Sequence, residues 1–169
     1  NVDILKSTIY ADENGSGYES NIDVRDNSNL TIENSVYDVF YAYDKIKIVH
    51  STSSLAISYS FIEEGQESIL DWNSHLSEGS LIWGQGNIEE YGNDGIGGDG
   101  PQFQNPLNDD FRLRYYSPLI DAGDPSSELD EDGTVSDMGA YPLNQVPGCI
   151  DPTGPNYNEN ATVPDESCN

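Results

Sequence analysis

The sequence predicts an all-β protein: a right-handed parallel β-helix (solenoid) fragment with an irregular C-terminal cap and a small disulfide-closed tail. Three observations predict this fold: four segments that align column by column, short runs of alternating apolar and polar residues, and no stretch of sustained helical periodicity. We therefore expect β-helix coils in residues 1–103, a cap with an acidic loop in residues 104–146, and a Cys-bracketed module or linker in residues 147–169.

The four aligned segments carry most of this prediction. They read NVDILKSTIY, NLTIENSVYD, SLAISYSFIE and SLIWGQGNIE, and they begin 28, 25 and 26 residues apart, at Asn1, Asn29, Ser54 and Ser80. Three of their columns hold apolar residues: Val2, Leu30, Leu55, Leu81; Ile4, Ile32, Ile57, Trp83; and Ile9, Tyr37, Ile62, Ile88. A further column, between the second and the third of these, holds small residues: Ser7, Ser35, Ser60, Gly86. Each segment shifts phase at the small residue, as a strand does when it bends at a corner.

A second series of short alternating runs lies between these segments, at residues 20–26, 44–50 and 67–73. Two or three short strands in every roughly 25 residues describe a coil that stacks on the next coil about 4.8 Å away, so that equal columns become interior ladders. A single coil cannot bury its inward residues without its neighbours. A β-sandwich of about seven strands is the alternative; it explains the alternation but not the matching columns.

The charge excludes several partners. The chain has 6 Lys and Arg against 31 Asp and Glu, a formal charge of −25. Nucleic acids and anionic membrane surfaces are held by clustered Lys and Arg, so we expect no nucleic-acid partner. No apolar run approaches the length of a membrane span, so we expect no membrane insertion. The 11 Tyr, 4 Phe and 2 Trp distinguish the chain from a disordered acidic tail.

The two cysteines, Cys149 and Cys168, bracket a short loop near the C-terminus of a chain that has no other thiol. This pattern predicts one disulfide and hence an oxidising, extracellular compartment. Because Asn1 falls inside a strand-like pattern, we expect the chain to be a piece of a longer secreted or cell-surface protein.

Residues 54–143 carry a resemblance to a known family. Gly86 to Ile88 is followed by a Pro-x-Phe strand, by Ser-Pro-x-Ile-Asp-Ala-Gly, by Asp-x-Asp-Gly-Thr and by Asp-Met-Gly-Ala-Tyr, in that order. This order and spacing resemble the terminal turns and cap of secreted bacterial right-handed β-helix proteins of the pectate-lyase-like superfamily. The resemblance implies fold and secretion but no activity, because members range from polysaccharide lyases to adhesins and phage proteins. The insertion at residues 92–100 is longer than usual in that family.

The segment GCIDPTGPNYNENATVPDESC, residues 148–168, is similar to short Cys-bracketed modules of large surface proteins in marine bacteria. Such modules keep Gly-Cys-x-Asp-Pro-Thr, an Asn-Tyr-Asn segment and Ala-Thr-Val-x-Asp-x-Ser-Cys; Pro155 and Glu166 are the less usual residues here. The resemblance implies a linker or spacer ahead of a sorting domain.

A calcium site is the main cofactor prediction. The run DEDGTVSD, residues 130–137, has alternating carboxylates and a glycine, which is typical of a calcium loop but lacks the full EF-hand frame. We expect this acidic stretch to fold back over the last coil, where calcium would neutralise its crowded charges. The predicted ligands are Asp124, Asp130, Asp132 and Asp137; the alternative is a solvated turn in which Asp137 only caps backbone groups.

Other motifs have both a functional and a structural interpretation. The run GNDGIGGDG at residues 92–100 is either a single copy of a calcium-binding glycine-aspartate repeat or a flexible glycine-rich loop. His50 and His75 have no Ser or Cys partner at a suggestive spacing, so we expect structural histidines. Four tyrosines would form a sugar-stacking surface or serve only packing: Tyr41, Tyr43, Tyr115 and Tyr116.

The function predicted from these patterns is a non-catalytic, calcium-stabilised segment that serves adhesion, glycan binding or extracellular assembly. Its partners would be an extracellular polysaccharide or other copies of a surface protein. The alternative is the cap end of a polysaccharide lyase or glycoside hydrolase with its active site in turns outside this chain. Asp109 and Asp110 are adjacent and would point to opposite faces of a strand, so they would not flank one glycosidic bond.

Overall fold

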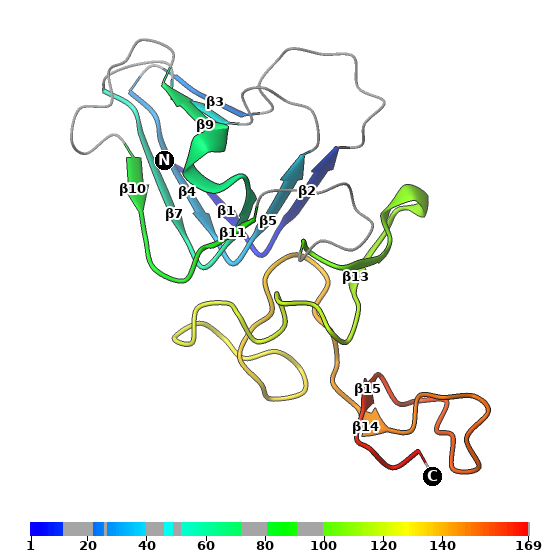
Figure 1. Cartoon of the computed structure of the whole chain (residues 1–169). Coiled ribbons are helices and arrows are strands. Elements are labelled where there is room, and N and C mark those ends of the chain that lie inside the picture. Colours follow the sequence, from blue (N-terminus) through cyan, green and yellow to red (C-terminus); the bar gives the residue numbers. More distant parts are fainter. Residues whose placement is uncertain are drawn as a thin grey trace.

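The computed structural model describes residues 1–11, 22–25, 27–39, 46–48, 52–71, 81–90 and 100–168. Within these residues the protein consists of β-strands, two short 3₁₀ helices and irregular segments, without an α-helix. The strands of the N-terminal half gather into sheets, and the irregular C-terminal half lies beneath them in the view of Figure 1. The all-β prediction is confirmed.

Three parallel sheets make up the N-terminal half. Sheet A contains β1 (Val2–Leu5), β4 (Asn29–Glu33), β7 (Ser54–Ser58) and β10 (Leu81–Trp83). Sheet B contains β2 (Thr8–Ala11), β5 (Val36–Val39), β8 (Phe61–Glu63) and β11 (Ile88–Glu90), and sheet C contains β3 (Ile22–Val24), β6 (Ile46–Ile48) and β9 (Ile69–Asp71). The chain visits the sheets in the order A, B, C; we call each such visit a coil.

All neighbours within these three sheets pair in parallel. A β-sandwich is built from antiparallel sheets, so the alternative fold does not describe these coils. The 3₁₀ helix η1 (Gly65–Ser68) joins β8 to β9 in the third coil.

The register of sheet A confirms the first two predicted columns. Ile4 pairs with Ile32, Ile32 with Ile57, and Ile57 with Trp83. The column that begins at Val2 continues through Leu30 and Leu55 to Leu81 in the same way. Each column is therefore a ladder through four coils.

The last coil departs from the predicted third and fourth columns. Ile88 pairs with Phe61, and Glu89 pairs with Ile62, so Ile88 does not continue the column of Ile9, Tyr37 and Ile62. The cause is one extra corner residue, Gly86, whose φ of 75° is left-handed. A Cβ at Gly86 would lie 2.3 Å from the Tyr59 ring, so glycine alone fits this corner.

Hydrogen bonds across the corners show that Asn87, and not Gly86, occupies the place of the corner serine in the last coil. The backbone N–H of Ser7 donates to Ser35 Oγ (3.2 Å), and that of Ser35 donates to Ser60 Oγ (3.2 Å). The N–H of Ser60 donates to Asn87 Oδ1 (3.1 Å), so the prediction that Gly86 ends this column is wrong. The amide oxygen of Asn87 supplies the acceptor that a glycine lacks.

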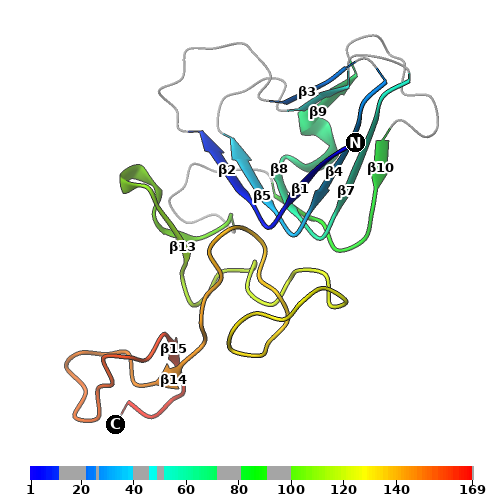
Figure 2. The ribbon, with the colours of Figure 1, turned by 180° about the vertical axis from the view of Figure 1, so that it is seen from behind.

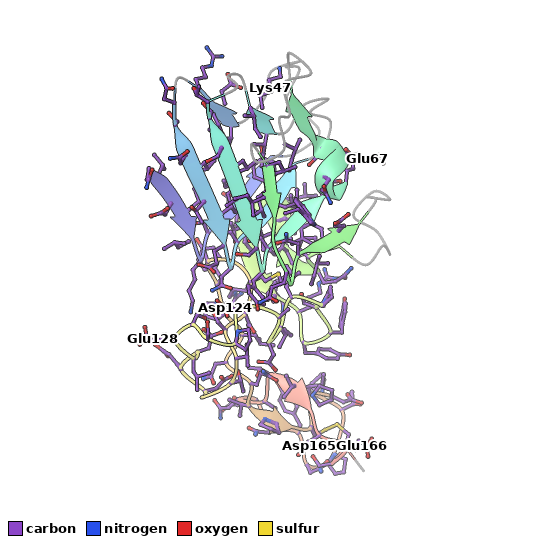
Figure 3. All side chains as sticks on the ribbon, turned by 90° about the vertical axis from the view of Figure 1, so that its left-hand side faces the viewer. Lys47, Glu67, Asp124, Glu128, Asp165 and Glu166 are labelled. Carbon is purple, nitrogen blue, oxygen red and sulfur yellow. A yellow bond between two sulfur atoms is a disulfide. The ribbon has the colours of Figure 1, made fainter. Side chains whose placement is uncertain are left out.

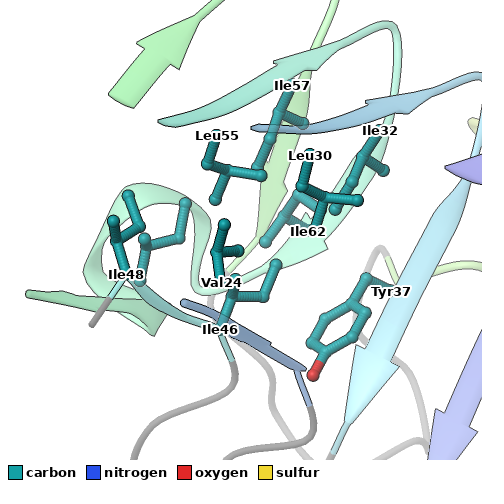
Figure 4. Packing of buried hydrophobic residues seen from close by; sticks show 10 residues of the cluster. Val24, Leu30, Ile32, Tyr37, Ile46, Ile48, Leu55, Ile57 and Ile62 are labelled. Atoms are coloured by element: carbon teal, nitrogen blue, oxygen red, sulfur yellow. The ribbon is translucent and has the colours of Figure 1, made fainter. Parts of the chain in front are cut away.

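The main core lies between the three sheets. Inward side chains from all three converge there (Figure 4): Val24, Leu30, Ile32, Tyr37, Ile46, Ile48, Leu55, Ile57, Ile62 and Ile69. Alternation in sheet A points Leu30 and Ile32 inward and leaves Thr31 on the outer face. The columns thus form a continuous apolar interior, which a single coil could not enclose.

The described residues of the central strands β5 and β8 of sheet B are buried on both faces. The outward residues Val36 and Phe61 belong to a second apolar cluster, together with Phe103, Leu113, Leu119 and Met138. The last three lie in the cap, residues 104–146, which is seen beneath the corners between sheets A and B in Figure 2. The cap reaches as far as the first coil, because Ala140 N–H donates to Thr8 Oγ1 (3.1 Å). We expected the acidic stretch to fold over the last coil; Ile88 of that coil packs against the cluster that the cap residues join, and the cap also binds the second coil through Asn34 and Asp124.

Two small strand pairs complete the described chain. Strand β12 (Phe103–Asn105) pairs antiparallel with β13 (Asp110–Leu113) across the 3₁₀ helix η2 (Pro106–Asn108). In the C-terminal module, β14 (Pro147–Gly148) pairs in parallel with β15 (Val163–Pro164). The predicted disulfide is confirmed: Cys149 and Cys168 are bonded, with Cα atoms 4.8 Å apart.

Candidate functional site

The acidic loop of the cap is organised by its own carboxylates. Gly133, with a φ of 86°, forms a tight turn in which its N–H donates to Asp130 O (2.9 Å). Asp132 Oδ1 accepts from Thr134 N–H (3.1 Å) and Thr134 Oγ1 (2.8 Å), and Asp132 Oδ2 accepts from Gln145 N–H (2.7 Å). These hydrogen bonds hold the pKa of Asp132 below its usual value, with the Gln145 N–H as the largest cause.

Asp137 is the buried centre of the cap, with 2% of its surface exposed. Its Oδ1 accepts from Asp121 N–H (2.8 Å) and its Oδ2 from Leu143 N–H (2.7 Å). Its own N–H donates to Asp130 Oδ2 (2.7 Å), so two predicted ligands are directly linked. Burial raises the pKa of Asp137 to about 6, and the nearby charges of Asp130 and Asp121 act in the same direction.

Asn34, at the corner of the second coil, connects the cap to the coils. Its Oδ1 accepts from Asp124 N–H (2.6 Å), and its carbonyl oxygen accepts from Gly139 N–H (2.8 Å). Asp124 Oδ1 in turn accepts from the N–H and the Oγ of Ser126, both at 2.8 Å. The first coil contributes the Lys6 ammonium, which lies 3.3 Å from Asp130 Oδ1.

The four predicted calcium ligands are therefore used in folding the cap. Asp130, Asp132 and Asp137 lie in one connected set of hydrogen bonds, whereas Asp124 is tied to Asn34. In the part of the chain that the structure describes, no group of three or more His, Cys, Asp or Glu side chains is arranged to hold a metal ion. Calcium binding stays a prediction, and the alternative that Asp137 caps backbone groups agrees with its two N–H donors.

A pair of exposed tyrosines lies on a turn of the cap next to β13. Ser117 N–H donates to Arg114 O (2.9 Å), which closes a turn with Tyr115 and Tyr116 at its two central positions. The rings meet edge to face with centroids 5.0 Å apart, and the residues are 44% and 52% exposed. Arg114 Nη1 donates to Tyr116 OH (2.9 Å), which orients the second ring.

Both ends of this turn are anchored. Arg114 N–H donates to Gln102 O (2.9 Å), and Ser117 Oγ donates to Pro101 O (2.7 Å). The turn is thereby held against the neighbouring segment, and the aromatic pair is presented from a fixed backbone.

Several predicted residues lie outside the described part of the chain: Tyr41, Tyr43, His50, His75 and residues 92–99 of the glycine-rich run. Asp109 occupies the turn before β13 with a φ of 59°, and Asp110 Oδ2 pairs with Arg112 Nη2 (2.7 Å). The Arg112 hydrogen bond lowers the pKa of Asp110, so this carboxylate is engaged with a neighbouring cation.

Sequence reasoning missed Asn34 and Gln145, which tie the cap together. The signal for Asn34 was its position directly before the small residue of its column, where a corner requires a left-handed residue and Asn adopts that conformation readily. Gln145 offers no comparable signal in the sequence; its backbone N–H binds Asp132, and its Nε2 donates to both carboxylate oxygens of Asp121 (3.1 and 3.0 Å).

Comparison with protein-family models, with curated proteins and with solved structures found no match. The resemblances to pectate-lyase-like β-helix proteins and to Cys-bracketed surface modules therefore remain predictions. No helix within the described residues has the length and apolar character that crossing a membrane requires.

Proposed function

We propose that residues 1–103 form coils of a right-handed parallel β-helix. Support comes from the repeated visiting order of the three sheets and from the in-register ladders. The coil spacing of 25 to 28 residues suits three short strands and three corners per coil. A right-handed path is what parallel strands connected by crossovers nearly always adopt.

On this scaffold we propose a non-catalytic role in extracellular adhesion, by binding of polysaccharide at Tyr115 and Tyr116. The observation that carries the proposal is the exposed, edge-to-face ring pair on an anchored turn. Aromatic faces bind the C–H surfaces of sugar rings, and the adjacent hydroxyl and guanidinium groups offer hydrogen bonds to sugar hydroxyls. The disulfide of the C-terminal module suits a secreted or cell-surface location.

The charge of the chain selects among polysaccharides. At a formal charge of −25 the protein repels polyanionic chains, so the ligand is a neutral glycan. Extracellular assembly with other copies of a surface protein is the second partner class that the coil architecture suits.

A depletion assay on insoluble neutral polysaccharides, such as cellulose and β-1,3-glucan, tests the proposal. We expect the wild-type chain to bind, and the double variant Tyr115→Ala, Tyr116→Ala to bind about tenfold more weakly, a loss of about 1.4 kcal/mol. The matched control is Tyr141→Ala, Tyr157→Ala, which removes two tyrosines of similar exposure elsewhere.

Equal binding by both double variants would contradict a role for the pair. Alginate serves as the polyanionic comparison and should not bind. Release of reducing ends during incubation would favour the alternative of a glycoside hydrolase.

A further inference from the structure

The last residues of the cap, 143–146, which we call the strap, are bound on two sides. Leu143 N–H donates to Asp137 Oδ2 (2.7 Å), and Gln145 N–H donates to Asp132 Oδ2 (2.7 Å). The Gln145 side chain adds two contacts, because its Nε2 donates to Asp121 Oδ1 (3.1 Å) and Oδ2 (3.0 Å). The odd-numbered residues of the strap are therefore held by three carboxylates of the cap.

The even-numbered residues of the strap are held by the C-terminal module instead. Thr162 Oγ1 donates to Asn144 O (2.6 Å) and accepts from Val146 N–H (2.8 Å). Thr162 N–H in turn donates to Val146 O (2.8 Å). The backbone groups of successive residues in an extended chain point to opposite sides, so one side of the strap faces the cap carboxylates and the other faces Thr162.

The disulfide keeps Thr162 against the strap. Figure 3 shows the module directly beneath the cap. Strand β14 follows the strap and pairs in parallel with β15, which follows Thr162. Within residues 147–168, only Gly148 and Cys149 are buried. The module thus has almost no apolar core, and the bond between Cys149 and Cys168 is the covalent link that holds its two ends together.

The two cysteines of this disulfide differ in access. Cys149 is 1% exposed, whereas Cys168 is exposed. The thiolate of a dithiol reductant therefore attacks Cys168 Sγ, and Cys149 leaves as a thiolate. The second thiol of the reductant then displaces Cys168 and forms the reductant's own disulfide. The protein gains two electrons and two protons and ends with two cysteine thiols.

We propose that the Cys149–Cys168 disulfide is a redox switch of the cap. With the bond intact, the module holds one side of the strap and so keeps Gln145 on Asp121 and Asp132. Reduction releases the module from the strap, and the cap carboxylates then lose the N–H donors that the strap carries. The oxidising extracellular location proposed above keeps the disulfide formed, and the inference does not depend on glycan binding.

Hydrogen exchange of the strap amides, at Leu143 and Gln145, tests the switch in the full chain. It is measured before and after reduction with dithiothreitol, and mass spectrometry after alkylation confirms that both thiols have formed. We expect these two amides to exchange at least about tenfold faster after reduction, because the strap no longer stays on its carboxylate acceptors. The amides of β4 and β7 should keep their protection, since the coils contain neither cysteine.

The variant Thr162→Val tests the coupling with the disulfide left intact. Valine keeps the shape of the side chain but removes the hydroxyl that binds the strap. We expect the Gln145 amide to exchange at least about threefold faster than in the oxidised wild type. The matched control is Thr153→Val, where the lost hydroxyl donates to Asp151 Oδ1 (2.8 Å) inside the module, and strap exchange should stay unchanged.

The double variant Cys149→Ser, Cys168→Ser should show the fast strap exchange of the reduced wild type and no response to dithiothreitol. Equal strap exchange in the oxidised and reduced wild type would overturn the proposal, as would wild-type exchange in Thr162→Val. Loss of protection in β4 and β7 on reduction would overturn it as well, because the disulfide would then stabilise the whole chain rather than the cap.

Discussion

Asp137 shows how one buried carboxylate organises the cap. Two backbone N–H groups, from Asp121 and Leu143, come from segments on either side and meet at its two oxygens. Buried N–H donors without an acceptor cost about 1–3 kcal/mol each, so the carboxylate stabilises the loops that carry them. Burial nonetheless disfavours its charge and raises its pKa to about 6.

This raised pKa predicts a pH dependence with a definite sign. The folded state holds the Asp137 proton more tightly than the unfolded state, so the contribution of Asp137 to stability is complete below the usual aspartate pKa of 3.8 and is lost as pH rises through about 6. Asp137→Asn cannot titrate, and its amide N–H₂ cannot accept the second N–H, so it is less stable at every pH.

We expect the difference in unfolding free energy between wild type and Asp137→Asn to shrink by about 2 kcal/mol from pH 4 to pH 7. Urea unfolding at several pH values measures it. The comparison with the variant cancels the opposite slope of carboxylates with lowered pKa, such as Asp132. A difference in unfolding free energy that stays constant with pH would contradict the raised pKa of Asp137.

Asn34 joins backbone conformation to a long-range contact. It adopts a φ of 50°, and its buried Oδ1 binds Asp124 N–H, 90 residues away. Asn34→Gly keeps the conformation but loses the acceptor, which should cost about 1–3 kcal/mol. Asn34→Ala adds the left-handed strain of a Cβ, about 1 kcal/mol more. Chemical unfolding of both variants measures the two contributions, and equal stability of both would argue against strain at this corner.

The coil is the element on which the fold depends. A coil supplies one strand to each of the three sheets, and its inward residues meet equivalent residues of the coils before and after it. The energy of a substitution in a column should therefore follow the position of its coil in the stack rather than the residue type.

Leu55→Ala and Val2→Ala test this dependence within a single column. Leu55 is buried between two coils, so its truncation should cost about 2–5 kcal/mol through lost burial and a cavity. Val2 is mostly exposed, so its truncation should cost less than about 1 kcal/mol. Melting and urea unfolding give both values; similar losses at the two sites would refute the ladder interpretation.

The whole molecule combines a strongly acidic chain with a cap that contacts several coils. The cap covers the outer face of sheet B and reaches Thr8 and Lys6 of the first coil, which links residues more than a hundred positions apart. Mutual repulsion at a formal charge of −25 opposes this compaction. Hydrogen bonds from backbone N–H groups to the cap aspartates offset part of that repulsion.

Calcium would offset more of the repulsion, and it remains a prediction at this scale. We expect a higher melting midpoint in several millimolar calcium than in excess EDTA, with magnesium as the control, because an ion bound only to the folded state stabilises it by mass action. Equal midpoints in all three solutions would mean that Asp130, Asp132 and Asp137 serve the cap backbone alone.

Local periodicity in the sequence sufficed to predict the ladders of sheet A and the all-β class. The columns of Val2 and Ile4 recur at nearly constant spacing, and stacking coils require equal residues at equal places. The disulfide was predictable for a similar reason, since Cys149 and Cys168 are the only two thiols of the chain.

The tertiary structure alone decided the features that depend on distant partners. The extra corner residue Gly86 moves the strand that follows it by one position in the ladder. Short apolar and polar alternation continues after Gly86, so the sequence does not show this move, and only the pairing of Ile88 with Phe61 does. The aspartates look like ligands in sequence, yet their oxygens meet N–H groups that the folded cap brings to them. Periodicity records which residues face inward, whereas the hydrogen-bond partners of a cap are set by how an irregular segment packs across the coils.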